Sequence, residues 1–492
     1  MLRKVLVANR GEIALRVIRA CREMGLQTVA VYSDADRGGL HVQYADEAAH
    51  LGPSPSSESY LRIDKILSAA RHHAADAVHP GYGFLSENAD FAEACESNNL
   101  TFIGPSSISI RAMGSKTGAR RLASSVGTPI VPGTEQGVTD MDDARRIAKG
   151  IGFPVLVKAA AGGGGKGMRR VDSEGELESA LRDAASEAER AFRSPEVYLE
   201  KFVERPRHIE IQLLGDKHGH LLHLGERECS IQRRHQKVVE ECPSPLMSIR
   251  PELRHEMGRA AVRAAAAAGY HNAGTVEFLV DADGHYYFLE MNTRLQVEHP
   301  VTELVTGLDL VHWQLRIASG ERLTLHQDDI SWRGSAIECR LYAEDSREFL
   351  PSPGTITSLA LPSGPGVRID SGVYNGWTVS VDYDPLLAKL TVHAPDRARA
   401  IARLRQALSE AHIGGIETNL DFFRAVVDDP AFQAAQLHTN FIPEFFARRT
   451  PESPVATDIA AAALVAVGNG TKPQPTAPAR SSLSAWGRQA LP

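Results

Sequence analysis

The chain has 492 residues, which is too long for one ordinary hydrophobic core, so we expect two to four domains. Hydrophobic residues make up 43% of it and charged residues 23%, as is typical of a soluble globular protein. The net charge of −7 argues against nucleic acid or an anionic membrane as a partner. No apolar run approaches the roughly 18 residues of a membrane span, and the start MLRKVLVANRGE turns polar too early for a signal peptide.

The cysteine pattern argues against disulfides and zinc ligation. The count is odd, no two cysteines have CxxC spacing, and most lie in apolar stretches. The five are Cys21, Cys95, Cys229, Cys242 and Cys339. We therefore expect reduced thiols and a cytoplasmic protein.

The first 115 residues alternate between short apolar strands and helical segments. Strands are expected in KVLVA (4–8), TVAVY (28–32), TFIGP (101–105) and the start of DAVHPGYGFLSEN (76–88). A helix should run from the NRGE turn (9–12) to Gly25 as its C-cap, and Ser86 should be the N-cap of another. This alternation predicts a parallel, doubly wound sheet. The NRGE turn lacks GxGxxG, so we assign no nicotinamide site to it.

The rest of the chain changes character twice. Residues 116–205 form a second α/β stretch, and HIEIQLL, HLLHLGE, TVEFLV and HYYFLEMN, between 207 and 300, are expected to be antiparallel strands. Residues 335–395 are again rich in strands, and the helical stretch DRARAIARLRQALSEAHI follows them. Residues 450–492 are rich in proline and alanine, so we expect a mostly mobile linker there.

The glycine run KAAAGGGGKGM (158–168) is not a Walker P-loop. Ala160 stands where that motif needs its first glycine, and Gly167 stands where it needs the magnesium-binding hydroxyl. The run lies between two expected strands, FPVLVK (153–158) and MRRV (168–171). A glycine hairpin of this kind suits a flexible lid whose N–H groups approach phosphates, with Lys158 adding charge. The alternative is a mobile surface hairpin without function.

Two acids lie within apolar strands. They are Glu277 in TVEFL and Glu290 in FLEMN, and Asn292 follows the second. An acid that faces a core is costly unless it is paired or bound to a cation. These oxygens could hold Mg²⁺ or Mn²⁺ that bridges nucleotide phosphates. The alternative is a pair of exposed strand residues.

The segment NTRLQVEHP (292–300) follows at once. Arg294, Gln296 and Glu298 alternate in it, so they should share one face of an extended chain. An arginine can hold a small planar anion bidentately, and a glutamate can take its proton. Upstream, CSIQRRHQKVVEE (229–241) concentrates basic residues over 233–237, either as a phosphate and anion clamp or as a solvated basic loop.

These residues resemble the biotin carboxylase component of biotin-dependent carboxylases, which are ATP-grasp enzymes. The resemblance covers roughly residues 1–447. It rests on the motifs VANRGEIALRVIRA, HPGYGFLSEN, KAAAGGGGKGM, ERECSIQRRHQKVVEE, EMNTRLQVEHPVTE, ECRLYAED and LPSPG. The combination of EMNTRLQVEHPVTE with RRHQKVVEE is highly specific.

The resemblance implies a multidomain α/β and α+β chain built on an ATP-grasp fold. The implied parts are a Rossmann-like N-terminal domain at 1–115, an ATP-grasp domain at 116–318 with a mobile glycine-rich lid at about 131–204, a mixed β-rich C-terminal domain at 333–447, and a mobile tail at 448–492.

It also implies roles for the residues that match the motifs. ATP would be contacted by Lys116, Lys158, Gly162, Gly163, Gly164, Gly165, Lys166, Gly167, His208, Gln232 and His235. The adenine would be framed by Glu200, Lys201, Val203 and Leu279. Two Mg²⁺ or Mn²⁺ ions would be held by Glu277, Glu290 and Asn292. Bicarbonate would be held by Lys237, Arg294, Gln296, Val297 and Glu298, and biotin by Tyr82 and Arg340.

The implied reaction is the ATP- and bicarbonate-dependent carboxylation of biotin N1′ through carboxyphosphate. Glu298 would deprotonate bicarbonate, and Arg340 would stabilise the enolate-like oxygen of biotin. Lys237 and Arg294 are the other residues expected to act in catalysis. The glycines would let the lid close over the ATP phosphates and exclude water.

Partners are implied too. The chain lacks the Met-Lys-Met that normally carries biotin, so we expect a separate biotin carboxyl carrier protein and a separate carboxyltransferase. Arg16, Arg19 and Glu23 share a helix surface that helps form a homodimer in the family, although an exposed ion-paired face is the plainer interpretation. Two other functions stand as alternatives: another ATP-grasp ligase, such as a carbamoyl phosphate synthetase half, and a non-catalytic nucleotide-binding subunit of a carboxylase complex.

Overall fold

The computed structural model describes residues 2–134, 137–138, 140–159, 168–192 and 196–449. The chain divides into two compact units, Met1–Pro443 and Glu444–Pro492. Of the second unit, only 444–449 are described, and most of them belong to helix α15 (Phe441–Arg448). The tail expected to be mobile therefore lies almost wholly outside the described residues. No helix in the described ranges is both long and apolar enough to cross a bilayer.

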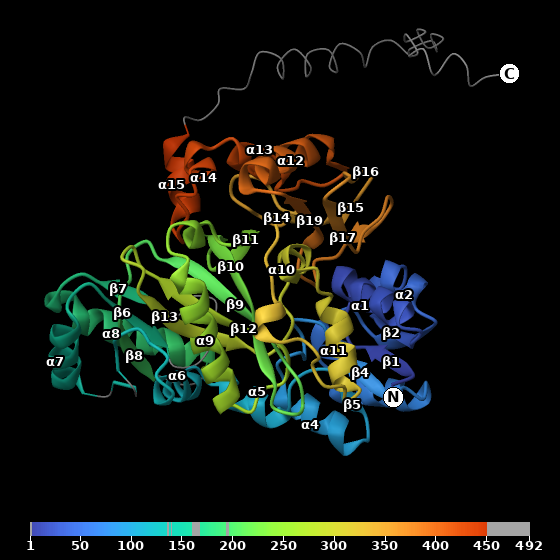
Figure 1. Ribbon diagram of the computed structural model, residues 1–492, viewed down its shortest axis with the longest axis horizontal. Coiled ribbons are helices and arrows are strands. Elements are labelled where there is room, and N and C mark those ends of the chain that lie inside the picture. The colour runs from blue at the N-terminus through green and yellow to red at the C-terminus, as the bar shows by residue number, and fades with distance from the viewer. Residues whose placement is uncertain (1, 135–136, 139, 160–167, 193–195, 450–492) are drawn as a thin grey trace, which may run out of the picture. The chain divides into compact units, whose positions relative to one another are not determined.

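The N-terminal part is the predicted parallel sheet, in the strand order β3-β2-β1-β4-β5 (Figure 1). Its strands are β1 (Lys4–Val7), β2 (Gln27–Ser33), β3 (Glu47–Gly52), β4 (Ala77–His79) and β5 (Thr101–Phe102). Its helices are α1 (Gly11–Glu23), α2 (Leu40–Tyr44), α3 (Ile63–His72), α4 (Ala89–Ser97) and α5 (Ser107–Gly114). The strand order reverses between β1 and β4, which makes their carboxyl ends the crevice of the sheet.

Two helix boundaries test the sequence interpretation. Helix α1 buries Ile13, Val17 and Ile18 on one side, and Gly25 follows its end with φ of +71°, as predicted. The predicted N-cap at Ser86 is wrong. Asn88 caps α4 instead, because its side chain accepts a hydrogen bond of 2.8 Å from the Phe91 amide, whereas Ser86 is buried in the preceding turn.

The predicted glycine-run hairpin is present as far as it is described. Strands β6 (Val155–Ala159), β7 (Arg169–Val171) and β8 (Val197–Lys201) form a small antiparallel sheet in the order β7-β6-β8. Helices α6 (Lys116–Ser125), α7 (Met141–Ile151) and α8 (Glu174–Phe192) belong to the same stretch of chain. The glycines Gly162–Gly165 lie outside the described residues.

The centre is an antiparallel sheet of eight strands in the order β13-β12-β9-β10-β11-β14-β19-β17. Its strands are β9 (Arg207–Gly215), β10 (Leu221–Arg233), β11 (Gln236–Cys242), β12 (Asn272–Val280), β13 (Tyr286–Asn292), β14 (Ser335–Tyr342), β17 (Val367–Ser371) and β19 (Leu386–Ala394). The antiparallel strands predicted between 207 and 300 are confirmed. The strand-rich stretch after 335 continues this sheet, because β11 pairs with β14.

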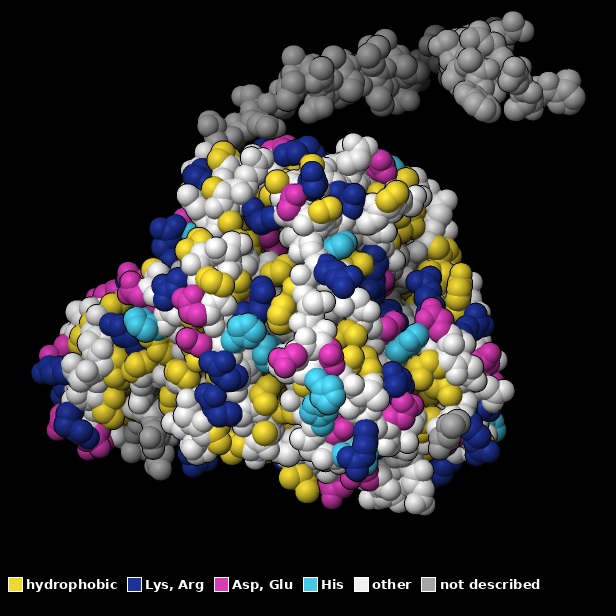
Figure 2. Space-filling view, viewed as in Figure 1, with side chains coloured by type: hydrophobic (Ala, Val, Ile, Leu, Met, Phe, Trp, Pro, Cys, Tyr) yellow, Lys and Arg dark blue, Asp and Glu magenta, His cyan; other side chains and the backbone are white. Residues whose placement is uncertain are grey.

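The remaining elements cover the sheet or extend from it. The helices are α9 (Glu252–Ala267), α10 (His299–Thr306), α11 (Leu310–Ala318), α12 (Arg397–Glu410), α13 (Leu420–Val427) and α14 (Pro430–Gln433). Two small sheets pair β15 (Gly354–Thr355) with β18 (Thr378–Val379) and β16 (Ser358–Ala360) with β20 (His412–Gly414). On the face shown in Figure 2, Lys and Arg side chains are interspersed with Asp and Glu, so no field of one sign covers it.

Candidate active site

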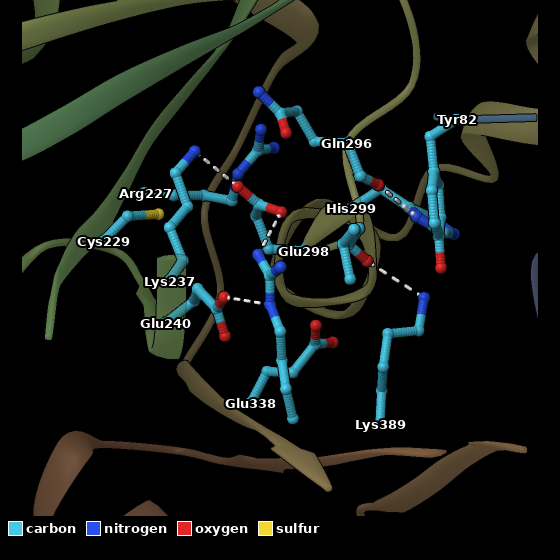
Figure 3. Close-up of polar contacts among 12 residues, drawn as sticks. Tyr82, Arg227, Cys229, Lys237, Glu240, Gln296, Glu298, His299, Glu338 and Lys389 are labelled. Carbon is cyan, nitrogen blue, oxygen red and sulfur yellow. Dashed lines mark hydrogen bonds and ion pairs between the residues drawn. The ribbon is translucent and has the colours of Figure 1, made fainter. Parts of the chain in front are cut away.

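The candidate active site lies where β11, β12, β14 and the turn before α10 meet. These elements supply Lys237, Glu277, Arg340 and Glu298, in that order. All four side chains are at least nine-tenths buried. Figure 3 shows Lys237 pointing toward Glu298 from one side, with Glu240 and Glu338 beneath.

Lys237 is the hub of the cluster. Its Nζ lies 2.7 Å from Glu277 Oε1 and 2.7 Å from Glu298 Oε1, and it also pairs with the Glu210 carboxylate. Burial alone would lower the pKa of Lys237, but these three carboxylates hold it well above its usual range. The side chain therefore stays an ammonium ion.

Glu210 was missed by the sequence interpretation. It lies in β9, is fully buried, and also pairs with Arg227 of β10. The sequence could have indicated Glu210, because this acid interrupts the apolar strand HIEIQLL in the same way as Glu277 interrupts TVEFL.

Glu298 is held between two cations. Besides Lys237, Arg340 Nη2 donates to Glu298 Oε2 at 2.8 Å, and Arg340 Nε donates to Glu240 Oε1 at 2.6 Å. Burial alone would raise the pKa of Glu298, but Lys237, Arg340 and Arg227 hold it well below its usual range. It is therefore a carboxylate at neutral pH.

The expected extended segment ends earlier than predicted. Arg294 Nη1 donates to Gln296 Oε1 at 3.2 Å, so these two side chains do lie together. Glu298, however, has φ of −81° and ψ of +13° at the N-cap of α10, so it is not part of an extended strand. The chain turns there because Pro300 in the first turn of α10 favours helical φ. Glu298 joins the site through this turn.

Arg294 is oriented by Glu87, which, like Glu210, the sequence analysis did not name as a site residue. Its Nε donates to Glu87 Oε2 at 2.8 Å, and its Nη2 donates to Asn292 Oδ1 at 3.0 Å. Glu87 also accepts from the Thr293 amide at 3.0 Å. Glu87 belongs to the HPGYGFLSEN stretch, so only the folded chain brings it to Arg294.

The residues expected to bind metal fit a divalent cation. Glu277 and Glu290 lie directly opposite each other in the β12–β13 pair, where like charges repel, and Lys237 Nζ at 2.7 Å from Glu277 offsets part of that repulsion. Asn292 Nδ2 donates to Glu277 Oε1 at 2.8 Å, which brings the amide beside the carboxylates. Carboxylate and amide oxygens are the ligands that Mg²⁺ and Mn²⁺ prefer in proteins.

The residues expected around the adenine have more varied surroundings. The Glu200 carboxylate pairs with Lys158 and Arg120 and is buried. Lys201 Nζ donates to the carbonyl oxygens of Gly152, at 2.9 Å, and Phe153, at 3.2 Å, so the ammonium anchors the start of β6. Val203 is half-buried beyond β8.

The other residues expected at the nucleotide lie on the central sheet. His208 Nε2 is 2.9 Å from Glu277 Oε2, and Leu279 pairs with His208 across β9 and β12. Gln232 Nε2 donates to the Cys229 carbonyl at 2.8 Å, and His235 occupies the tight β10–β11 turn with φ of +68°. Lys116 begins α6, but its side chain is outside the described part, as are Gly162–Gly167.

Tyr82, expected at biotin, lies in the glycine loop after β4, where its hydroxyl donates to Glu12 of α1.

The helix surface expected at a dimer contact is partly used for ion pairs within the chain. Arg16 pairs with Glu303 at 3.1 Å and Asp309 at 2.7 Å, and Glu23 lies 3.0 Å from His312. Arg19 remains exposed.

Comparison with known families gives three adjoining matches. Residues 1–110 match the biotin carboxylase N-terminal domain, and residues 338–444 match the biotin carboxylase C-terminal domain. Residues 115–326 match the ATP-binding domain of the carbamoyl-phosphate synthase L chain.

Among curated proteins, the chain is 52% identical over 442 residues to the biotin carboxylase of Nostoc sp., covering 90% of this chain and 98% of that one. It is 51% identical over 447 residues to biotin carboxylase 1 of Bacillus subtilis, covering 90% of this chain and 99% of that one.

Among solved structures, the biotin carboxylase of Campylobacter jejuni in a β-γ-ATP complex has a TM-score of 0.87 at 46% identity, covering 90% of this chain and 99% of that one. The biotin carboxylase domain dimer of Hydrogenobacter thermophilus 2-oxoglutarate carboxylase, with MgADP and bicarbonate, has a TM-score of 0.86 at 48% identity, covering 90% and 98%. With these matches along most of its length, the chain belongs to the biotin carboxylase family of ATP-dependent ligases.

Proposed function

We propose that this chain binds MgATP and bicarbonate and carboxylates N1′ of biotin presented by a carrier protein. The observation that carries the proposal is the chain of ion pairs from Lys237 through Glu298 to Arg340, all buried on three different elements. Such a cluster offers two fixed cations for an anion and one carboxylate as a base. The bicarbonate named with the Hydrogenobacter domain supports the same assignment.

In this proposal Glu298 accepts the bicarbonate proton. A bicarbonate oxygen then bonds to the γ-phosphorus as the bond to ADP breaks, which gives carboxyphosphate. An anion beside Lys237 would share that cation and weaken its hold on Glu298, so the pKa of Glu298 would rise and make it a better base. Arg294, with Gln296 beside it, would orient the anion by donating to its oxygens.

Arg340 and Tyr82 would serve the biotin end. Carboxyphosphate would divide into CO₂ and phosphate, the phosphate would take the N1′ proton, and N1′ would bond to CO₂. Arg340 would stabilise the negative charge on the biotin oxygen by donating from its guanidinium. Its bond to Glu298 at 2.8 Å supports a close approach of the bicarbonate step and the biotin step.

For the nucleotide, we propose Lys158, the glycine loop 162–167, His208, Gln232 and His235 as phosphate contacts, together with Lys116. Glu200, Lys201, Val203 and Leu279 would frame the adenine. Glu277, Glu290 and Asn292 would hold Mg²⁺ or Mn²⁺, which neutralises charge on the phosphoryl oxygens. Lys201 would act through its backbone, because its ammonium already donates to Gly152 and Phe153.

We also propose a biotin carboxyl carrier protein, a carboxyltransferase and a second copy of the chain as partners. Met-Lys-Met is absent from the 492 residues, which supports a carrier lysine outside them. The Hydrogenobacter domain is described as a dimer, which supports the homodimer. The described cysteines are all buried and free of disulfides, which supports a reducing compartment such as the cytoplasm.

The test is an assay of the purified chain with free biotin. Phosphate release should depend on bicarbonate, and labelled bicarbonate should be fixed only when biotin and ATP are both present. ATP cleavage that is indifferent to bicarbonate would favour another ATP-grasp ligase. Binding of ATP with no cleavage under any of these conditions would favour a non-catalytic role.

A further inference from the structure

The sequence analysis assigned no ligand to the NRGE turn (9–12). In the folded chain, this turn is hydrogen-bonded to the loop that carries Tyr82. The turn follows β1, and the loop follows the neighbouring strand β4, at the point where the strand order reverses. Asn9 Nδ2 donates to the carbonyl oxygens of Pro80, at 2.7 Å, and Tyr82, at 2.8 Å. Ligands of open parallel sheets usually lie in this crevice. Here the turn occupies part of it and holds the loop in place.

Glu12, at the start of α1, continues the connection through its side chain. It is 6% exposed, and its Oε1 accepts the hydrogen bond from the Tyr82 hydroxyl. The same oxygen lies 3.2 Å from Lys389 Nζ. A bond from a hydroxyl to an ionised carboxylate is about twice as strong as one between neutral groups. When it is ionised, Glu12 is therefore a firm anchor for the Tyr82 hydroxyl.

Lys389, in β19, links this anchor to the other side of the site. It is fully buried, and its Nζ donates to the carbonyl oxygen of Val297 at 2.9 Å. Val297 immediately precedes Glu298 in the turn before α10. In Figure 3, Lys389 and Lys237 approach this turn from opposite sides. Since a buried ammonium is costly unless it is paired, Lys389 ties Glu12 and Val297 to one position.

We propose that Glu12 and Lys389 are positioning residues of the biotin end of the site, where Glu12 holds the Tyr82 hydroxyl and Lys389 holds the Val297–Glu298 turn. The proposal rests on the proposed biotin carboxylase reaction. Neither residue touches a substrate in it. Each acts through its neighbour, and the ion pair between them fixes the distance from Tyr82 to Glu298.

The charges around the pair predict how it responds to pH. Glu12 is faced by Tyr82 from the loop, by Lys389 from β19, and by Asp370 and Arg368 from β17. The neutral imidazole of His299, from α10, is also near Lys389 and Asp370. Burial raises the pKa of Glu12 to about 7, although Lys389 opposes the rise. Above this pH the carboxylate holds Tyr82 more strongly, so use of biotin should weaken as the pH falls below about 7.

The first test is a double-mutant cycle between Glu12→Gln and Tyr82→Phe, measured as kcat/KM for free biotin. Each single variant should lose roughly 10-fold, the usual effect of one hydrogen bond to a charged group. The double variant should be no worse than Tyr82→Phe alone, because Glu12 acts through that hydroxyl. Losses that multiply would overturn the proposal. In Glu12→Gln, bicarbonate-dependent ATP cleavage should fall less than kcat/KM for biotin, because Asp370, 3.5 Å from Lys389 Nζ, remains as a partner of that ammonium.

Lys389→Met should instead lower both ATP cleavage and biotin carboxylation, because the Val297–Glu298 turn loses its donor. Lys389→Arg keeps the charge and should retain more of both activities. Equal losses in Lys389→Arg and Lys389→Met would contradict a role for the charge. Lys65→Met is a control for the loss of a lysine that donates to backbone carbonyl oxygens, because half-buried Lys65 donates to Leu51 at 2.7 Å and Glu58 at 2.6 Å in the N-terminal part.

Amide hydrogen exchange gives a readout that does not depend on turnover. Residues 80–84 should exchange faster in Glu12→Gln, and the segment around Val297 should exchange faster in Lys389→Met, while Lys65→Met changes neither. Unchanged exchange in both segments would overturn the proposal. If the wild-type chain fixes no bicarbonate on biotin, the proposed reaction fails, and the exchange result still decides whether Glu12 and Lys389 hold these segments.

Discussion

Arg340 Nη2 donates a hydrogen bond of 2.8 Å to Glu298 Oε2, although the two residues lie 42 positions apart in the chain. The resemblance to biotin carboxylases implies separate roles for them, with Glu298 at bicarbonate and Arg340 at biotin. The ion pair joins those roles, because any change at Arg340 alters the electrostatic environment of Glu298. In the proposed function, the bicarbonate step and the biotin step would therefore meet at one buried ion pair.

Replacing Arg340 by Met should alter the pH dependence as well as the rate. Without this cation the pKa of Glu298 should rise toward its usual range, so the carboxylate needed as a base is lost at a higher pH. The acidic limb of the pH–rate profile for bicarbonate-dependent ATP cleavage should therefore move upward. Carboxylation of free biotin should fall by about 100-fold or more. Arg340→Lys, which keeps a charge, should shift the limb less.

An acidic limb that stays in place in Arg340→Met would show that Glu298 is not the titrating base, or that Arg340 does not set its pKa.

Replacing Glu87 by Gln should weaken bicarbonate binding. Glu87 fixes the Arg294 guanidinium through a 2.8 Å bond, so a neutral amide should leave Arg294 freer to turn away. KM for bicarbonate should rise roughly 10-fold, the effect of one charge-assisted bond, while KM for ATP stays near wild type. Asp90→Asn is the control, because Asp90 is an exposed acid nearby in the chain that pairs with Arg111. Equal increases of KM for bicarbonate in Glu87→Gln and Asp90→Asn would contradict the role of Glu87 in orienting Arg294.

Acid should destabilise the N-terminal part through two buried histidines. Burial lowers the pKa of His41 and of His79 to about 4, below the usual 6.5. The unfolded chain therefore binds more protons than the folded chain between pH 6.5 and 4, and the free energy of unfolding should fall as the pH drops through this window. Each histidine accounts for on the order of 3 kcal/mol.

The measurement is urea unfolding at a series of pH values. His41→Gln should lose stability less steeply with acid than wild type, because the neutral amide takes up no proton on unfolding. Parallel curves for wild type and His41→Gln would contradict the assignment.

Local patterns were enough to predict most of the fold. The alternation of strands and helices up to residue 115 indicated a parallel sheet, and the period-two stretches between 207 and 300 indicated antiparallel strands, because each pattern reflects neighbouring residues. The pairing of β11 with β14 could not be foreseen. It sets Glu240 opposite Glu338 across about a hundred residues of chain, and no local pattern records such a register.

The candidate site likewise has residues that local sequence patterns indicated and residues that only the folded chain brings together. Acids inside apolar strands drew attention to Glu277 and Glu290, and Glu210 carries the same signal in its own strand. Lys389 interrupts the apolar strand LLAKLTVHA in the same way, but its partner Glu12 gave no such signal, because only the fold brings β19 to α1. The position of Glu298 in a turn depended on where α10 begins, and helix boundaries are the least certain part of a sequence pattern.

The most direct test of the whole account is bicarbonate-dependent ATP cleavage by Glu298→Gln. Glutamine keeps the shape of the side chain between Lys237 and Arg340 but cannot take a proton. Loss of a general base costs about 100- to 10,000-fold in rate, while ATP affinity, measured by calorimetry with a non-hydrolysable analogue, should change little. A variant that keeps more than about a tenth of the wild-type rate would contradict the account, because another group would then remove the bicarbonate proton.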